Sequence, residues 1–182
     1  MKAKSMGFKG GFARQAGFLV REAVMIAAVF IAIVAAALGK YLWDTQNDVN
    51  AAASAVQIVA ETARSTYAGA GYGTATMDFT LNTNGAFANP RYRVAVASGV
   101  ATVTNQNNAS VTVTGTTNNF TYSESGLSYA VCAGFTPRLT PYVWATVKIG
   151  AAAARLVPIS ATQAATDCAA LNGGAIVLTA VS

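Results

Sequence analysis

The stretch that decides the fold is ARQAGFLVREAVMIAAVFIAIVAAALGKY, residues 13–41. It contains an uncharged apolar run of seventeen residues, Ala23–Gly39, which is nearly long enough to span a bilayer as a helix. Four of the twelve Lys and Arg residues precede position 17, and this positive charge predicts that the N-terminal end stays in the cytoplasm. One acid, Glu22, lies at the edge of the run, where a carboxylate is costly unless it is paired.

The helical pattern continues beyond the apolar run. Small and apolar residues recur on one face from Leu42 to Ala63, and charged residues lie mostly elsewhere, as in an amphipathic helix. We therefore predict one helix from Phe18 to about Tyr67, about 75 Å long at 1.5 Å per residue. Three glycines soon after position 68 would end it. Gly39 lies where the two kinds of sequence meet, either as a tolerated small residue or as a point of helix flexibility.

Short strands are expected after residue 73, where Val, Thr, Tyr and Phe alternate with Asn, Gly and Ser. In the first of them, RYRVAVASG (residues 91–99), Tyr92, Val94 and Val96 are expected to face the core, and Arg91 and Arg93 the solvent. Three further short runs follow at hairpin spacing. Together they predict an antiparallel sheet with one buried face.

The C-terminal part is expected to contain two short helices, each followed by a strand. Apolar residues recur every four positions from Leu127 to Leu139, which predicts a helix carrying Cys132. Ser160 is the expected N-cap of a second, alanine-rich helix with Cys168 near its end. If this half of the chain is exported, a disulfide is the natural pairing of the two cysteines.

Composition argues against catalysis and against nucleic-acid binding as the main function. The chain has no histidine and only seven acids, so it lacks the usual groups for general acid–base chemistry and for a zinc site. No phosphate-binding loop is present. The net charge of +5 comes largely from the first 17 residues, and the remainder is nearly neutral. We expect no enzymatic activity, no cofactor, no bound metal and no nucleic acid as primary ligand.

The order of basic leader, Gly17, apolar Phe18, Glu22 and apolar helix resembles the class III signal of type IV prepilins. The layout of the C-terminal half is similar to that of type IVb pilins, including those of conjugative thin pili. The resemblance implies cleavage between Gly17 and Phe18, N-methylation of Phe18, and pairing of the new amine with Glu22 of a neighbouring subunit. That pair would set the axial register rather than add net stability. Alternatively, Glu22 is an interfacial acid that caps the first helical turn.

We therefore expect an α+β protein with the type IV pilin fold, in which a long N-terminal helix packs on an antiparallel sheet and the C-terminal region is disulfide-bonded. The expected regions are a leader (1–17), the membrane and filament-core half of the helix (18–39), its amphipathic half (40–69) and a globular head (70–182).

The resemblance implies a type IVb-like major pilin that serves adhesion, aggregation or conjugative contact. Its partners would be further copies of itself, a prepilin peptidase, an assembly ATPase and an inner-membrane platform protein. The precursor would lie in the inner membrane, with its leader cytoplasmic and its head periplasmic, and the assembled pilus would be extracellular. The alternatives are a minor pilin or a type II secretion pseudopilin and, from another class, an uncleaved membrane-anchored binding domain.

Overall fold

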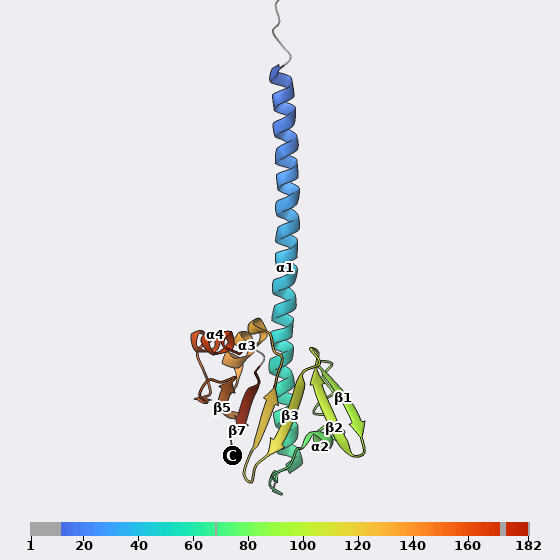
Figure 1. Ribbon diagram of the computed structural model, residues 1–182, viewed down its shortest axis with the longest axis vertical. Helices are drawn as coiled ribbons and strands as arrows, with labels where there is room; N and C mark the ends of the chain where they lie inside the picture. The colour runs from blue at the N-terminus through green and yellow to red at the C-terminus, as the bar shows by residue number, and fades with distance from the viewer. Residues whose placement is uncertain (1–11, 68, 172–173, 182) are drawn as a thin grey trace, which may run out of the picture. The chain divides into compact units, whose positions relative to one another are not determined.

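Helix α1 (Phe12–Tyr67) contains 56 residues and dominates the computed structural model (Figure 1). The structure describes residues 12–67, 69–171 and 174–181, and side chains only from Val24 onward. The helix ends as predicted, but it begins at Phe12 rather than Phe18. Residues 12–17, which belong to the expected leader, are therefore helical. Positions 13–16 are all Ala, Arg or Gln, which have high helix propensity and extend the helix toward the N-terminus.

The chain divides within α1 into two units, Met1–Asp44 and Thr45–Ser182. The second unit contains a seven-stranded sheet with all pairs antiparallel and the order β1-β2-β3-β4-β7-β5-β6. The predicted strands are thus confirmed, and β6 is an addition. The strands are β1 (Tyr92–Ala97), β2 (Val100–Asn105), β3 (Ser110–Gly115), β4 (Phe120–Glu124), β5 (Trp144–Ile149), β6 (Arg155–Leu156) and β7 (Ile176–Ala180).

Four short helical elements complete this unit: α2 (Asp78–Thr83), α3 (Tyr129–Phe135), the 3-10 helix η1 (Thr136–Arg138) and α4 (Ala161–Ala169). Both predicted helices are present. The Ser160 side chain caps α4 by accepting a hydrogen bond from the backbone N–H of Gln163 at 3.2 Å. Helix α2 was not predicted, because its six residues have no side-chain cap and too short a pattern to be periodic.

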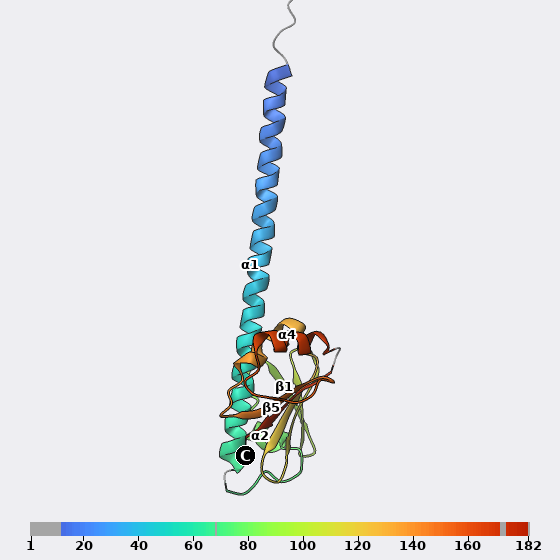
Figure 2. The ribbon, with the colours of Figure 1, turned by 90° about the vertical axis from the view of Figure 1, so that its left-hand side faces the viewer.

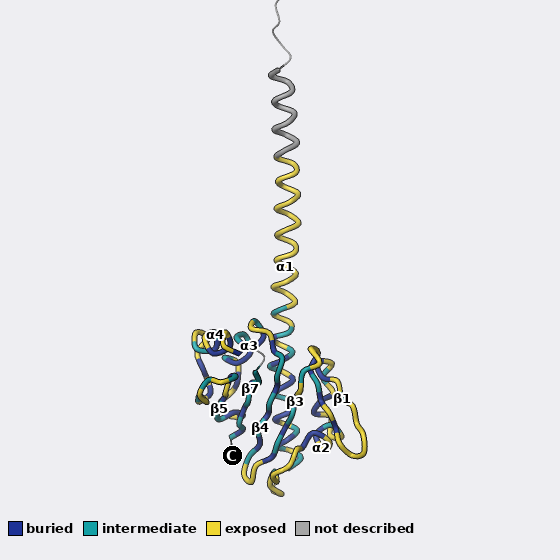
Figure 3. The backbone as a smooth tube through the Cα atoms, viewed as in Figure 1, coloured by how far each residue is buried: buried dark blue, intermediate teal, exposed yellow. Residues whose placement is uncertain are grey.

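The core of the second unit lies between its segment of α1 and the sheet (Figures 2 and 3). The buried helix residues are mainly small, which lets the helix axis approach the sheet closely. On the sheet, Phe120 and Trp144 pack edge to face with ring centroids 5.7 Å apart. The buried residues on the helix are Val49, Ala52, Ala55, Val56, Val59, Ala60 and Ala63.

Strand β1 differs from its predicted alternation. Tyr92 is buried, but Val94 is only half-buried and Val96 is 53% exposed, whereas Arg91, expected in solvent, is buried. Strand β1 is an edge strand paired only with β2, and its far end extends beyond the core. Arg91 precedes the strand and turns inward because a buried carboxylate, Glu124, pairs with it.

The predicted disulfide is present and joins Cys132 on α3 to Cys168 on α4, with the two Cα atoms 5.9 Å apart. Both cysteines are buried among apolar side chains. The bond closes a loop with a sequence separation of 36. It therefore restrains the unfolded chain and links the two helices of the C-terminal region.

Replacing Cys132 with Ser is expected to lower the free energy of unfolding by about 4 kcal/mol, the chain-entropy value for a loop of this length. Urea denaturation monitored by tryptophan fluorescence would measure the change. Since both thiols belong to one bond, Cys168→Ser should cost a similar amount, and the double variant should cost little more than either single one. Full additivity of the two losses would contradict this account.

Candidate functional site

The apolar segment, residues 24–43 of α1, is exposed along its whole length. No part of the most apolar window of α1 is buried. Among the described helices, α1 is the one that is long and apolar enough to cross a membrane. At 1.5 Å per residue it would measure about 30 Å, the thickness of the hydrocarbon core of a bilayer. Its large apolar side chains are Val24, Met25, Ile26, Val29, Phe30, Ile31, Ile33, Val34, Leu38, Tyr41, Leu42 and Trp43.

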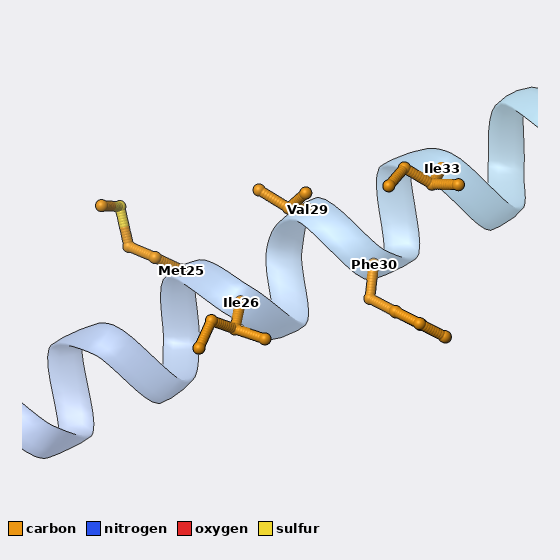
Figure 4. A pocket seen from close by; sticks show the side chains of 5 residues that line it. All are labelled: Met25, Ile26, Val29, Phe30 and Ile33. Atoms are coloured by element: carbon orange, nitrogen blue, oxygen red, sulfur yellow. The ribbon is translucent and has the colours of Figure 1, made fainter.

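These side chains surround the helix rather than forming a single stripe. Met25, Val29 and Ile33 lie one turn apart, and with Ile26 and Phe30 they border a shallow apolar hollow on the helix surface (Figure 4). An amphipathic helix on a soluble protein would place charges opposite this surface, but no charged residue occurs from Val24 to Gly39. The segment is therefore suited to an environment that is apolar on all sides, either lipid or other helices.

Leu42 belongs to this exposed surface, with 66% of its area accessible. The sequence had placed it on the core-facing stripe of the amphipathic half. In the second unit, Thr45 and Asp48 are half-buried, and the first buried residue is Val49. The change in periodicity at Gly39 therefore precedes the start of the core by more than two helical turns.

The predicted processing residues lie near the start of this helix. The backbone of α1 includes Gly17, Phe18 and Glu22, but their side chains are outside the described ones. Their roles in cleavage, N-methylation and subunit registration remain predictions. Helix α1 continues through Gly39 without interruption, and no neighbouring atom would meet a Cβ there. Close packing therefore does not require glycine at this position, and its role in flexibility remains a prediction.

A buried polar network that the sequence analysis missed joins three parts of the sheet. Arg91 Nη2 contacts Glu124 Oε1 at 2.5 Å, and Asn105 Nδ2 donates to the same oxygen at 2.9 Å. The Tyr122 hydroxyl donates to Glu124 Oε2 at 2.6 Å and lies 3.0 Å from the hydroxyl of Tyr92. Burial raises the pKa values of Tyr92 and Tyr122 far above the usual range for tyrosine. Both phenols therefore stay neutral, and the network serves to hold the strands in register.

The alternation of strand β4 could have revealed the central acid. Phe120, Tyr122 and Glu124 occupy alternate positions, so a strand that buries the two aromatic residues also buries the acid. A buried carboxylate requires a cationic partner. That partner, Arg91, is 33 residues away in sequence, so pattern alone could not identify it.

A second buried acid, Asp78, lies at the start of α2 and has no cationic partner among the described residues. Its Oδ1 atom accepts a hydrogen bond from the backbone N–H of Val113 at 2.7 Å, and the residue is 3% exposed. Burial raises the pKa of this carboxyl to about 6, and the bond from Val113 offsets only part of that effect. Asp78 therefore changes charge close to neutral pH.

The remaining ion pair lies at the other end of the sheet. Arg155 on β6 contacts Asp167 on α4 at 2.6 Å, and this hydrogen bond lowers the pKa of Asp167. The pair fixes a two-residue edge strand to the helix that carries Cys168. Within the described part of the chain, no group of three His, Cys, Asp or Glu side chains could hold a metal ion.

No family model matches the sequence, and no curated protein does. The structure, however, is similar to the crystal structure of the type IV b pilin from Salmonella typhi, with a TM-score of 0.57. The similarity covers 69% of this chain and 95% of that chain, at 22% sequence identity. The chain has the fold of a type IVb pilin. The predicted fold class, including the long helix, antiparallel sheet and disulfide, is thereby confirmed.

Glu124→Gln is expected to lower the free energy of unfolding by about 3 kcal/mol, because it leaves Arg91 buried without a counter-charge. The double variant Arg91→Met, Glu124→Gln removes both charges and should be more stable than Glu124→Gln alone. A double-mutant cycle measured by urea denaturation at pH 7 provides the comparison. If Arg91→Met lowers the free energy of unfolding further in the Glu124→Gln background, the ion pair is not the dominant interaction of these two residues.

Asp78→Asn is expected to stabilise the protein at pH 7.5 by about 2 kcal/mol. Because the folded pKa lies above the usual value of 3.8, the folded protein takes up a proton near pH 6 that the unfolded chain does not. Wild-type stability should therefore fall as the pH rises from about 4 to above 6, whereas the variant should lack this loss and keep the acceptor for Val113. Urea midpoints of wild type and Asp78→Asn at pH 4 and pH 7.5 would test this difference in pH dependence. Equal pH dependence in the two proteins would contradict the prediction.

Proposed function

We propose that this chain is the structural subunit of a type IVb pilus, a major pilin that assembles helically into an extracellular filament. The observation that carries the proposal is the apolar segment, exposed on all sides in a chain whose head has a pilin fold. Covering one large apolar side chain is favourable by about 1.5–3 kcal/mol, so this segment gains on the order of 20 kcal/mol from lipid or from neighbouring helices. The same side chains would anchor the precursor in the membrane and form the filament core.

Maturation would proceed at the N-terminal boundary of this segment. A prepilin peptidase would cut between Gly17 and Phe18 and methylate the new amine of Phe18. In the filament that cation would meet Glu22 of an adjacent copy. Two groups that are each costly in an apolar environment then satisfy one another in only one axial register.

The remaining requirements fall to other proteins. The sequence has no nucleotide-binding loop, so a separate assembly ATPase would supply the work through an inner-membrane platform protein. The leader would lie in the cytoplasm and the head in the periplasm before assembly. The finished filament would act in adhesion, aggregation or conjugative contact between cells. Copies joined by heterologous contacts that do not close into a ring form such open fibres.

Mass spectrometry of the mature protein from sheared surface filaments tests this function. The expected N-terminus is N-methylated Phe18, and the chain should be the most abundant protein in the filaments. An intact Met1 on a protein confined to the cell membrane would contradict the proposal and favour an anchored binding domain. Mature protein present only in traces would favour a minor pilin or pseudopilin.

Glu22→Val is expected to leave membrane insertion intact but to reduce filament yield more than tenfold, because the new amine loses its partner at every subunit contact. A loss of 1.4 kcal/mol per contact already corresponds to a factor of ten in an equilibrium constant. Quantitative immunoblots of membrane and sheared fractions would separate insertion from assembly. Glu61→Val, which removes an acid from the exposed side of the same helix, is the matched control and should assemble. Normal yield from Glu22→Val would contradict the registration role.

A further inference from the structure

A pocket in the head has the chemistry of a site for an alkylammonium group. It lies between helix α2 and the β1–β2 hairpin and has a volume of about 330 Å³, at the small end of ligand sites. Most of its lining residues are apolar, including Phe79 and Val100, and Asp78 is its one charged lining residue. The lining residues are Ala75, Thr76, Asp78, Phe79, Gly99, Val100 and Ala101.

Only one of the two carboxylate oxygens of Asp78 has a hydrogen-bond partner among the described residues. Its Oδ1 atom accepts the N–H of Val113, but Oδ2 has no donor among the described residues, and neither ion pair of the head includes this acid. A single carboxylate provides too few ligands for a hard metal ion, which takes six or more oxygens. A primary ammonium on an aliphatic chain fits both features, because its methylenes contact the apolar wall while its charge neutralises the acid.

The chain itself offers a donor of this kind. From Val24 onward, every described arginine makes a side-chain hydrogen bond, whereas neither lysine, Lys40 or Lys148, has a hydrogen-bond partner among the described residues. Lys40 lies within the apolar segment, near its C-terminal end. Lys148 is exposed on β5 in the head, so it is the lysine free to meet another head.

Lys148 cannot reach the pocket of its own chain. Strands β3, β4 and β7 separate β5 from β2, and at about 4.8 Å per strand this places the two sites roughly 19 Å apart. Strands β5 and β1 lie toward opposite sides of the head (Figure 1). A pocket on one side and its ligand on the other form a heterologous pair, the arrangement that propagates through an open fibre.

We propose that the Asp78 pocket receives the side chain of Lys148 from a second copy of this chain. The inference rests on the proposed filament and adds a contact between heads to the contacts of the helical core. Each copy would then supply one lysine and one pocket. Insertion of the lysine neutralises an acid that the isolated head leaves buried without a counter-charge.

The pocket can be tested on the dispersed full-length chain in detergent micelles, without any filament. Titration with n-butylammonium, followed by the amide NMR signals of Val100 and Val113, is expected to show saturable shifts with half-saturation at millimolar concentration. Equal concentrations of n-butanol, and n-butylammonium added to Asp78→Asn, should produce no saturable shift. Cooperative thermal unfolding at or above the wild-type temperature would show that the variant is folded. No saturation in the wild type, or equal binding by the variant, would overturn the pocket assignment.

The partner can be tested in assembled filaments with a carbodiimide, which joins a carboxylate directly to an amine in contact with it. Peptide mass spectrometry is expected to find Asp78 joined to Lys148 in filaments and not in dispersed protein. A link from Asp78 to a different lysine, or no link, would overturn the assignment of the partner. Since wild-type filaments and a mature N-terminus at Phe18 are measured independently, failure of this contact is distinguishable from failure of the pilin function.

Discussion

The constraint on which the rest depends is that the apolar segment cannot stay in water. It spans twenty residues of a helix that satisfies its own backbone hydrogen bonds, so only its side chains need a new environment. Lipid and a bundle of identical helices are both adequate, and neither requires a change in the backbone. If the chain assembles as proposed, its helix would move from membrane to fibre by exchanging one apolar environment for another. What distinguishes the two states is then the placement of the few charged groups.

The two parts of α1 differ in how their side chains pack, although the helix is continuous. In the apolar segment, large side chains surround the axis and are exposed. In the head, Ala52, Ala55, Ala60 and Ala63 bring the axis close to the sheet, and the bulk of the core comes from aromatic residues on the strands. Small residues on the helix and large ones on the sheet give the interdigitation that a dense core needs. The disulfide joins α3 to α4, and the Glu124 network joins β4 to β2 and to Arg91, which precedes β1.

Much of this structure follows from local pattern. The long helix, its end near the glycines, the serine cap of α4 and strands β2, β3, β4, β5 and β7 follow from periods of 3.6 and 2 and from capping residues, which act within a few positions. The missed features are non-local. Arg91 is buried because of Glu124, and the pocket exists because α2 meets a hairpin twenty residues later in the chain. Strand β1 lost its alternation because an edge position, which no single strand encodes, decides its burial.

In the proposed filament, charge burial would connect the head to assembly. Glu124 has its counter-charge within the chain, and Asp167 has Arg155, so both pairs are complete in the isolated subunit. Asp78 accepts a hydrogen bond from Val113 but has no counter-charge among the described residues. At neutral pH the isolated head is therefore less stable than the same head with a cation bound beside Asp78. A partner that binds the folded state alone stabilises it by mass action. In the proposed filament, a neighbouring copy would therefore stabilise a head that has one unneutralised acid, and this carboxylate would link assembly to folding stability.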